Sequence, residues 1–92
     1  MYAGEVLKRV EGLTYDRLTY FVRAGYVRPR RIKSQSLYYN DFSPEDVELI
    51  RHAWELISKH DLRIKTAFQR AREKGKDLQL NLGLEISPQN SE

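Results

Sequence analysis

Residues 13–33 read LTYDRLTYFVRAGYVRPRRIK, and this stretch decides how the rest of the chain is interpreted. The hydroxyl of Thr14 suits a helix N-cap. The apolar residues that follow lie three and four apart, as on one helix face: Leu18, Phe21 and Val22. Gly25 stands just past the expected helix end, where a left-handed backbone favours glycine. These features predict a helix from about Tyr15 to Ala24.

The same stretch is strongly basic. No Asp or Glu occurs between Arg17 and Asn40. The same segment contains six cationic residues: Arg17, Arg23, Arg28, Arg30, Arg31 and Lys33. Carboxylates gather directly afterwards, from Asp41 to Glu48, so the positive charge is local although the formal net charge is only +3. A short helix followed by an acid-free basic segment with interleaved aromatic residues is typical of a surface that meets a polyanion.

The composition argues against several other classes of protein. The 92 residues suit one domain, and the sequence pI is about 9.3. There is no cysteine, and His52 and His60 stand eight apart without a metal-binding pattern, so we expect neither a metal site nor another cofactor. No apolar run reaches the roughly 20 residues of a membrane span, and no signal-peptide core is present. We therefore expect a soluble, cytoplasmic protein.

Three further helices are predicted. The first runs from about Gly4 to Val10 and is joined to the helix at Tyr15 by a tight turn, an outline typical of a helix-turn-helix. The third begins at Ser43-Pro44, an N-cap followed by proline at the first helical position. It carries a wide apolar stripe, which includes Ile50 and Trp54. The fourth runs from about Arg63 to Lys74.

Between the second and third helices, the residues favour a β-hairpin. Tyr26 and Val27 have strand propensity, as do Leu37 to Tyr39, and the polar residues 33–36 (KSQS) between them suit the hairpin tip. Pro29 restricts the first strand to a short or edge position. The predicted fold class is thus mainly α with a small β-hairpin, or wing: a winged helix-turn-helix of four helices plus a C-terminal strand.

The C-terminal strand is expected because the apolar period changes from helical to alternating. The residues that alternate with polar ones are Leu78, Leu80, Leu82, Leu84 and Ile86. We therefore divide the chain into a winged-helix domain over 1–75 and a strand and tail over 76–92. A strand with one apolar face needs a partner, so this element is our candidate for homodimerisation. It pairs with the hairpin of its own chain or with the same strand of another copy.

The order of these elements resembles the winged-helix DNA-binding domain of MerR-type transcription regulators. LTYDRLTYFVRAGYVRPRR is similar to that family's second helix and first wing strand, and YYNDFSPEDVELI is similar to its wing exit. The chain departs from the family pattern at Thr19, Val22 and Asn40. It also lacks the family's long dimerisation helix and effector domain. The resemblance implies a DNA-binding fold and implies no metal, drug or redox sensing.

We expect the partner to be double-stranded DNA. In this prediction the start of the second helix reaches base edges in the major groove, with Arg17 able to contact guanine, while Tyr20, Arg23 and the basic wing contact the backbone or enter the minor groove. The predicted DNA-binding residues are Thr14, Tyr15, Asp16, Arg17, Tyr20, Arg23, Arg28, Arg30, Arg31, Lys33, Tyr39 and Asn40.

Several functions fit this pattern. The first is a sequence-specific transcription regulator, with or without a protein co-regulator, or an architectural DNA-bending protein of excisionase type. The second is a winged-helix module that binds another protein through its Trp54 face or terminal strand. We do not expect an enzyme, because the sequence has no glycine-rich phosphate loop, no activated nucleophile and no ligand cluster.

Overall fold

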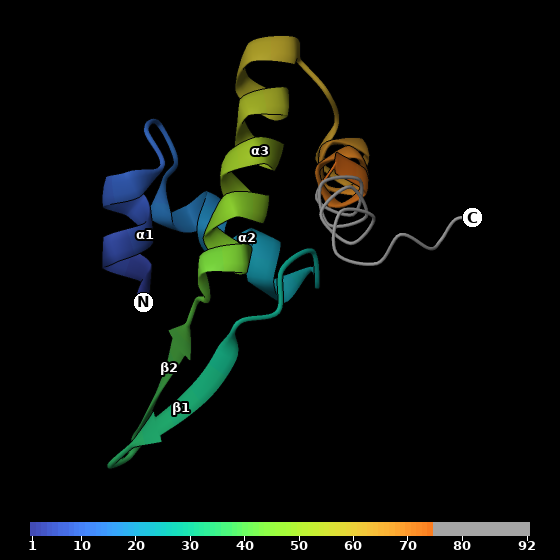
Figure 1. Ribbon diagram of the computed structural model, residues 1–92. Coiled ribbons are helices and arrows are strands. Elements are labelled where there is room, and N and C mark those ends of the chain that lie inside the picture. Colours follow the sequence, from blue (N-terminus) through green and yellow to red (C-terminus); the bar gives the residue numbers. More distant parts are fainter. Residues whose placement is uncertain (75–92) are drawn as a thin grey trace, which may run out of the picture.

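The computed structural model describes residues 1–74, which form a helical body and a projecting hairpin (Figure 1). The labelled elements are α1 (Ala3–Arg9), α2 (Tyr15–Arg23), β1 (Arg30–Ser34), β2 (Leu37–Asp41) and α3 (Pro44–His60). Residues 64–74 are also helical. The predicted class, mainly helical with an antiparallel hairpin, is confirmed. The strand predicted over 78–86 lies outside the described residues.

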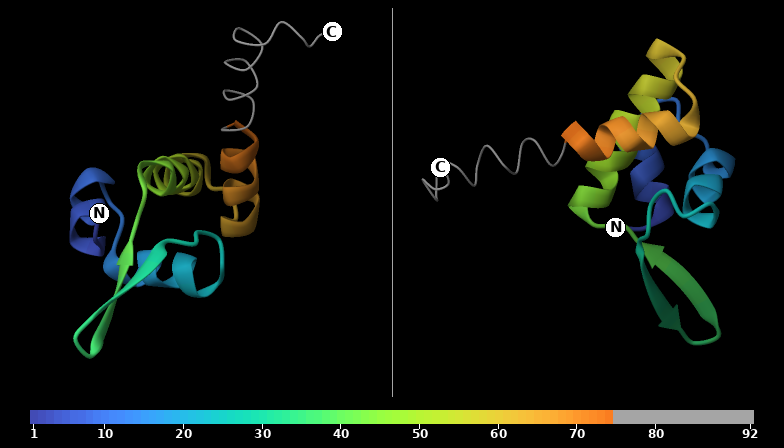
Figure 2. Two further views of the ribbon diagram at one scale, coloured as in Figure 1. Left: turned by 60° about the horizontal axis from the view of Figure 1, so that its bottom comes forward. Right: turned by 90° about the vertical axis from the view of Figure 1, so that its right-hand side faces the viewer.

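A single apolar core holds the helices together. The buried apolar side chains are Val6, Val10, Leu13, Leu18, Phe21, Val27, Phe42, Val47, Ile50, Ala53, Ala67, Phe68 and Ala71. Every helix of the described chain contributes to this set, and α3 runs between α1 and the helix at 64–74 (Figures 1 and 2). None of the described helices combines the length and the apolar character that crossing a bilayer requires.

The helix ends follow the local sequence. The Ser43 hydroxyl accepts a hydrogen bond from the Asp46 amide, and the Asp46 carboxylate accepts one from the Ser43 amide, which completes a capping box at the start of α3. At α2 the Thr14 hydroxyl accepts a bond from the Arg17 amide. Gly25 follows α2 with φ of 85°, the left-handed conformation that its place in the sequence predicts.

The hairpin differs from the prediction in its first strand. Strand β1 begins at Arg30, after Pro29, and pairs antiparallel with β2 from Arg30 opposite Asp41 to Ser34 opposite Leu37. Tyr26 and Val27 were expected to start this strand, and that prediction is wrong: both of their amides donate to the Phe21 carbonyl at the end of α2. Backbone groups used to close a helix are not free for strand pairing.

The tip and the base of the hairpin are both well defined. Its turn is Gln35–Ser36, shorter than the predicted residues 33–36. At the base, the Phe42 amide donates to the Met1 carbonyl, and the Met1 amino group donates to the Phe42 carbonyl at 3.1 Å. Phe42 itself is buried in the core. The start of the chain therefore fixes the point where the hairpin leaves the body.

The helix at 64–74 packs against the end of α2 through aromatic rings. Phe68 lies edge-on to Phe21, with ring centroids 4.8 Å apart, and stacks on Tyr26 at 5.2 Å. The Arg72 guanidinium also donates to the Tyr26 carbonyl. These contacts attach the segment between α2 and β1 to the helix at 64–74.

Candidate nucleic-acid interface

The two faces of the hairpin differ in chemistry. Side chains alternate across a strand, so Arg31 and Lys33 share one face with Tyr38 and Asn40, which we call the cationic face. The Arg31 guanidinium lies 5.0 Å from the centre of the Tyr38 ring, and the Lys33 amino group lies 5.8 Å from it. The opposite face carries the apolar residues Ile32, Leu37 and Tyr39 toward the tip, and Arg30 opposite Asp41 at the base.

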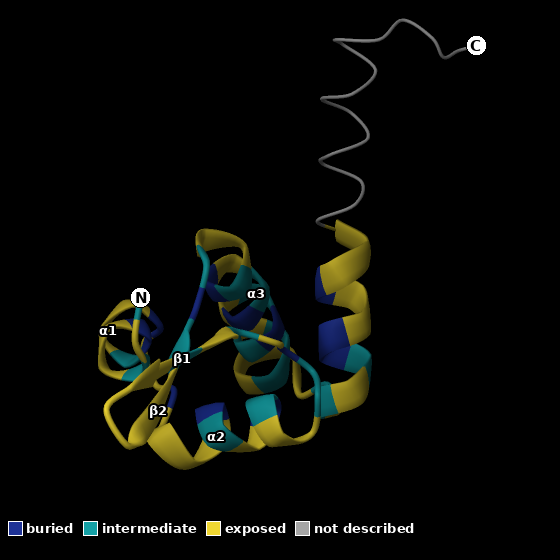
Figure 3. Ribbon diagram, turned by 90° about the horizontal axis from the view of Figure 1, so that it is seen from below, coloured by how far each residue is buried: buried dark blue, intermediate teal, exposed yellow. Residues whose placement is uncertain are grey.

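The cationic face is turned toward α2. Its residues Arg31 and Asn40 line a surface hollow together with side chains of α2. The polar lining of this α2–hairpin hollow is Tyr15, Thr19, Arg23, Arg31 and Asn40, and its apolar floor is Ala3, Leu18, Val22 and Phe42. Figure 3 views the molecule from below and shows both elements largely exposed on this side. Two arginines from separate elements thus converge on one accessible concavity.

The cations of the basic segment do not pair with carboxylates within residues 1–74. Within residues 1–74, salt bridges between Arg or Lys and carboxylates join Glu5 to Arg9 in α1, and Glu48 to Arg51 and Glu55 to Lys59 in α3. None of the described salt bridges includes the predicted cations Arg17, Arg23, Arg28, Arg30, Arg31 and Lys33, and all of these are exposed. The positive charge is therefore directed to solvent or to a partner.

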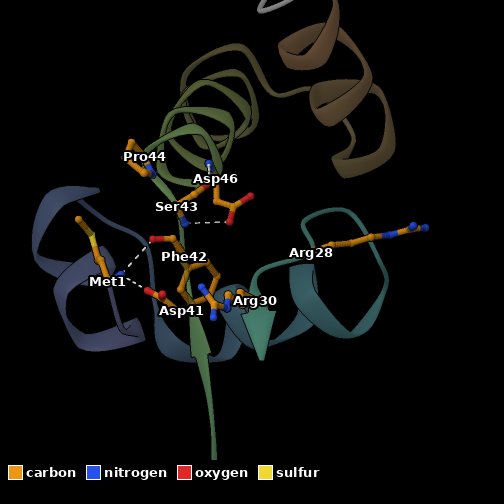
Figure 4. A pocket seen from close by; sticks show the side chains of 8 residues that line it. All are labelled: Met1, Arg28, Arg30, Asp41, Phe42, Ser43, Pro44 and Asp46. Atoms are coloured by element: carbon orange, nitrogen blue, oxygen red, sulfur yellow. Dashed lines mark hydrogen bonds and ion pairs between the residues drawn. The ribbon is translucent and has the colours of Figure 1, made fainter. Parts of the chain in front are cut away.

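The carboxylate closest to this surface in the strand register is Asp41, opposite Arg30. Its partner is the Met1 amino group, as Figure 4 shows at the base of the hairpin. Arg30 lies beside this pair without an ion pair to Asp41 in the described chain, and Arg28 extends away from the pair (Figure 4). The acid is thus neutralised without consuming an arginine of the basic segment.

Arg17 lies on another flank of α2. Arg17 and Arg23 are six residues apart, which places them roughly 120° apart around a helix. Arg17 is near α3, where its guanidinium lies 5.9 Å from the centre of the Trp54 ring. The Trp54 indole donates a 3.0 Å hydrogen bond to the Glu11 carbonyl in the turn between α1 and α2. Arg17 is therefore separate from the α2–hairpin hollow, although it is exposed.

The remaining predicted residues are spread around the hollow. Tyr20 is exposed on α2, 6.3 Å from the Tyr26 ring, and Asp16 is exposed in the first turn. Tyr39 lies on the hairpin face opposite the cationic face, with its ring centroid 5.6 Å from that of Tyr2. Thr14 caps α2 through its side chain. Four of the predicted residues therefore line the α2–hairpin hollow: Tyr15, Arg23, Arg31 and Asn40. The other predicted residues lie outside it.

Two residues of this surface are absent from the predicted set. Thr19 lines the hollow between Tyr15 and Arg23, and Tyr38 lies under the two cations of β1. The helical period places Thr19 four residues from both Tyr15 and Arg23, so a signal for it was present in the sequence. No such signal exists for Tyr38, because its contacts depend on the strand register.

No group of three or more His, Cys, Asp or Glu residues that could hold a metal ion occurs in residues 1–74. The His52 Nε2 atom lies 3.8 Å from Glu48 Oε1, four residues earlier on α3. Comparisons with models of protein families, with curated proteins and with solved structures found no match to this chain. The function is therefore inferred from the residues of the chain itself.

Proposed function

We propose that this chain is a DNA-binding protein of winged helix-turn-helix type, in which α2 occupies the major groove and the hairpin acts as the wing. The proposal includes a role in transcription regulation, which the resemblance of residues 2–73 to MerR-type regulators supports. The single observation that carries it is the α2–hairpin hollow, where Arg23 and Arg31 converge without a carboxylate partner in the described chain.

The hollow suits a phosphate backbone. A phosphodiester needs positive charge and hydrogen-bond donors at the same place. Arg23 and Arg31 supply both, and the Thr19 hydroxyl and Asn40 amide add uncharged donors. The exposed side of α2 then faces one groove, with Asp16 and Tyr20 available to base edges or sugars. An α-helix fits the major groove, which is about 12 Å wide.

Arg17 has a distinct role in this proposal. Its position against Trp54 places it on the opposite flank of α2 from the hairpin. A guanidinium there can contact guanine, or the backbone on the other side of the major groove. We expect Arg17→Ala to relax sequence preference if Arg17 contacts a base, and equal losses on selected and random duplexes would remove that role.

Salt-dependent binding of the purified chain to duplex DNA tests the proposal. Each phosphate that a protein neutralises adds about 0.9 to the steepness with which log affinity falls against log salt. We expect Arg23→Ala and Arg31→Ala each to reduce this steepness by about that amount. Arg51→Ala removes the same charge from α3 and serves as the matched control, because Arg51 already pairs with Glu48. An equal effect of all three variants would contradict the assigned surface.

The double variant Arg30→Ala/Arg31→Ala extends the test to the wing. We expect it to weaken binding to selected and random duplexes alike, because backbone contacts carry no direct sequence information. Selection of bound duplexes from a random pool supplies the specific sequence. Absence of any duplex binding at low salt would reject the proposal and favour a protein-interaction module.

A further inference from the structure

We propose that Gln35, at the tip of the hairpin, enters the minor groove beside the major groove occupied by α2 and reads base edges there. This inference rests on the proposed function. It adds a specific residue and a form of base discrimination to the contact with the backbone or the minor groove that is expected of a basic wing.

The backbone conformation of Gln35 is the first observation. Its φ is 57°, in the left-handed region that glycine and asparagine adopt at lower cost than glutamine. Gln35 is exposed, and its side-chain amide makes no hydrogen bond within the described residues. No hydrogen bond of the side chain therefore offsets this cost. A two-residue hairpin turn requires a positive φ at this position, and glycine or asparagine would adopt it at lower cost, so the choice of glutamine points to a function for its side chain.

The position of the hairpin is the second observation. The hairpin extends away from the helices, with its tip as the most distant part (Figure 2). Its base lies across the α2–hairpin hollow from α2. In duplex DNA a single backbone strand separates the major groove from the neighbouring minor groove. If that strand occupies the hollow while α2 is in the major groove, the hairpin lies over the minor groove.

The size of the tip decides which residues can enter. Paired strands lie about 4.8 Å apart between their backbones, while the minor groove is only about 6 Å wide. Two strands that carry long side chains are too wide for it, whereas the turn has only short side chains beside Gln35. Ser34 and Ser36, on either side of Gln35, have short side chains. Gln35 is therefore the side chain that reaches furthest from the turn.

The chemistry of the amide matches what the minor groove offers. All base pairs present acceptors there, and only G·C adds a donor, the N2 amino group of guanine. The Gln35 amide nitrogen can donate to adenine N3 or thymine O2, and its oxygen can accept from the guanine amino group. Lys33 and Arg31 on the adjoining strand supply charge for the groove walls. Glutamine is among the residues that minor-groove proteins use for this purpose.

Modified duplexes test the groove directly. A duplex recovered from the random pool is synthesised with inosine in place of guanine, which removes the minor-groove amino group, or with diaminopurine in place of adenine, which adds one. Both changes leave the major-groove edge of the purine as it was. Each duplex is titrated with the wild-type chain, with Gln35→Gly, and with Gln69→Ala, which removes an exposed glutamine amide from the helix at 64–74.

We expect one or two flanking positions at which these modifications change wild-type and Gln69→Ala affinity by about five- to tenfold, but Gln35→Gly affinity by less than twofold. The urea midpoint of Gln35→Gly should equal or exceed that of the wild type, because glycine suits the left-handed turn. Identical modification profiles for all three chains would overturn the inference and leave the proposed function intact. A wild-type chain that binds no duplex would overturn both.

Discussion

Gly25 and Gly4 have opposite backbone requirements. Gly25 has φ of 85°, and a Cβ there would meet nothing within 4 Å, so only the backbone resists a side chain. We expect Gly25→Ala to lower the free energy of unfolding by about 1 kcal/mol. Gly4 lies inside α1 with equal open space, and Gly4→Ala should raise this energy by about 0.5 kcal/mol. Urea denaturation measures both, and two changes of the same sign would contradict the assignment.

Trp54 can report directly on Arg17. It is the only tryptophan of the chain, and the Arg17 guanidinium lies 5.9 Å from its ring centre. If Arg17 moves to a base or a phosphate when DNA binds, the surroundings of the indole change. We therefore expect duplex binding to alter Trp54 emission in the wild type and in Lys33→Ala, but much less in Arg17→Ala. The same emission change in Arg17→Ala would show that the change does not come from movement of Arg17.

At the scale of elements, the start of α3 depends on its capping box. Ser43→Ala removes the acceptor of the Asp46 amide and should reduce the free energy of unfolding by about 1 kcal/mol. Ser58→Ala is the control: the Ser58 hydroxyl donates to the Trp54 carbonyl within the same helix, on its exposed side. We expect that change to stay within about 0.5 kcal/mol in thermal or urea unfolding. Equal losses of unfolding free energy in the two variants would show that the Ser43 cap stabilises α3 no more than the Ser58 hydrogen bond does.

The element boundaries show what local signals can predict. The α2 cap at Thr14, the α2 end at Gly25 and the α3 cap at Ser43 depend on neighbouring residues, and each was predicted correctly. The start of the first strand was not predicted correctly. Strand propensity favours Tyr26 and Val27, but their tertiary contacts place both residues outside the strand. The Phe21 carbonyl takes their amides, and Tyr26 stacks on Phe68, far away in sequence. Local propensity contains no information about such partners.

The candidate interface also has features that the sequence predicts and features that it does not. Its basic character was predictable from the acid-free run of residues 17–40. The convergence of Arg23 with Arg31, and the separation of Arg17, were not, because they depend on the packing of α2 and on the hairpin register. Likewise, the interaction of Asp41 with the Met1 amino group joins positions that no local pattern connects. Charge composition thus leads to the expected partner class, while the proposed contacts depend on the geometry.

For the whole molecule, the outstanding prediction is dimerisation through residues 78–86. In the proposed function one copy contacts few base pairs, and proteins with a helix-turn-helix commonly bind two half-sites as dimers. In this segment the apolar residues occupy every second position from Leu78 to Ile86. If the segment pairs as a strand between copies, its apolar side is buried and its polar side is not. Residues on these two sides therefore form matched tests.

We expect the wild-type chain to sediment as a dimer at micromolar concentration. Leu80→Lys/Leu82→Lys places two charges on the apolar side and should give a monomer. Gln79→Lys/Asn81→Lys adds the same charge on the polar side and should remain dimeric. Sedimentation velocity of the three chains, with a chain ending at Lys74 as the monomer reference, measures this. If the wild type and the Leu80→Lys/Leu82→Lys variant both match the reference, this segment does not hold two copies together, and the proposed DNA binding would involve a monomer or another contact.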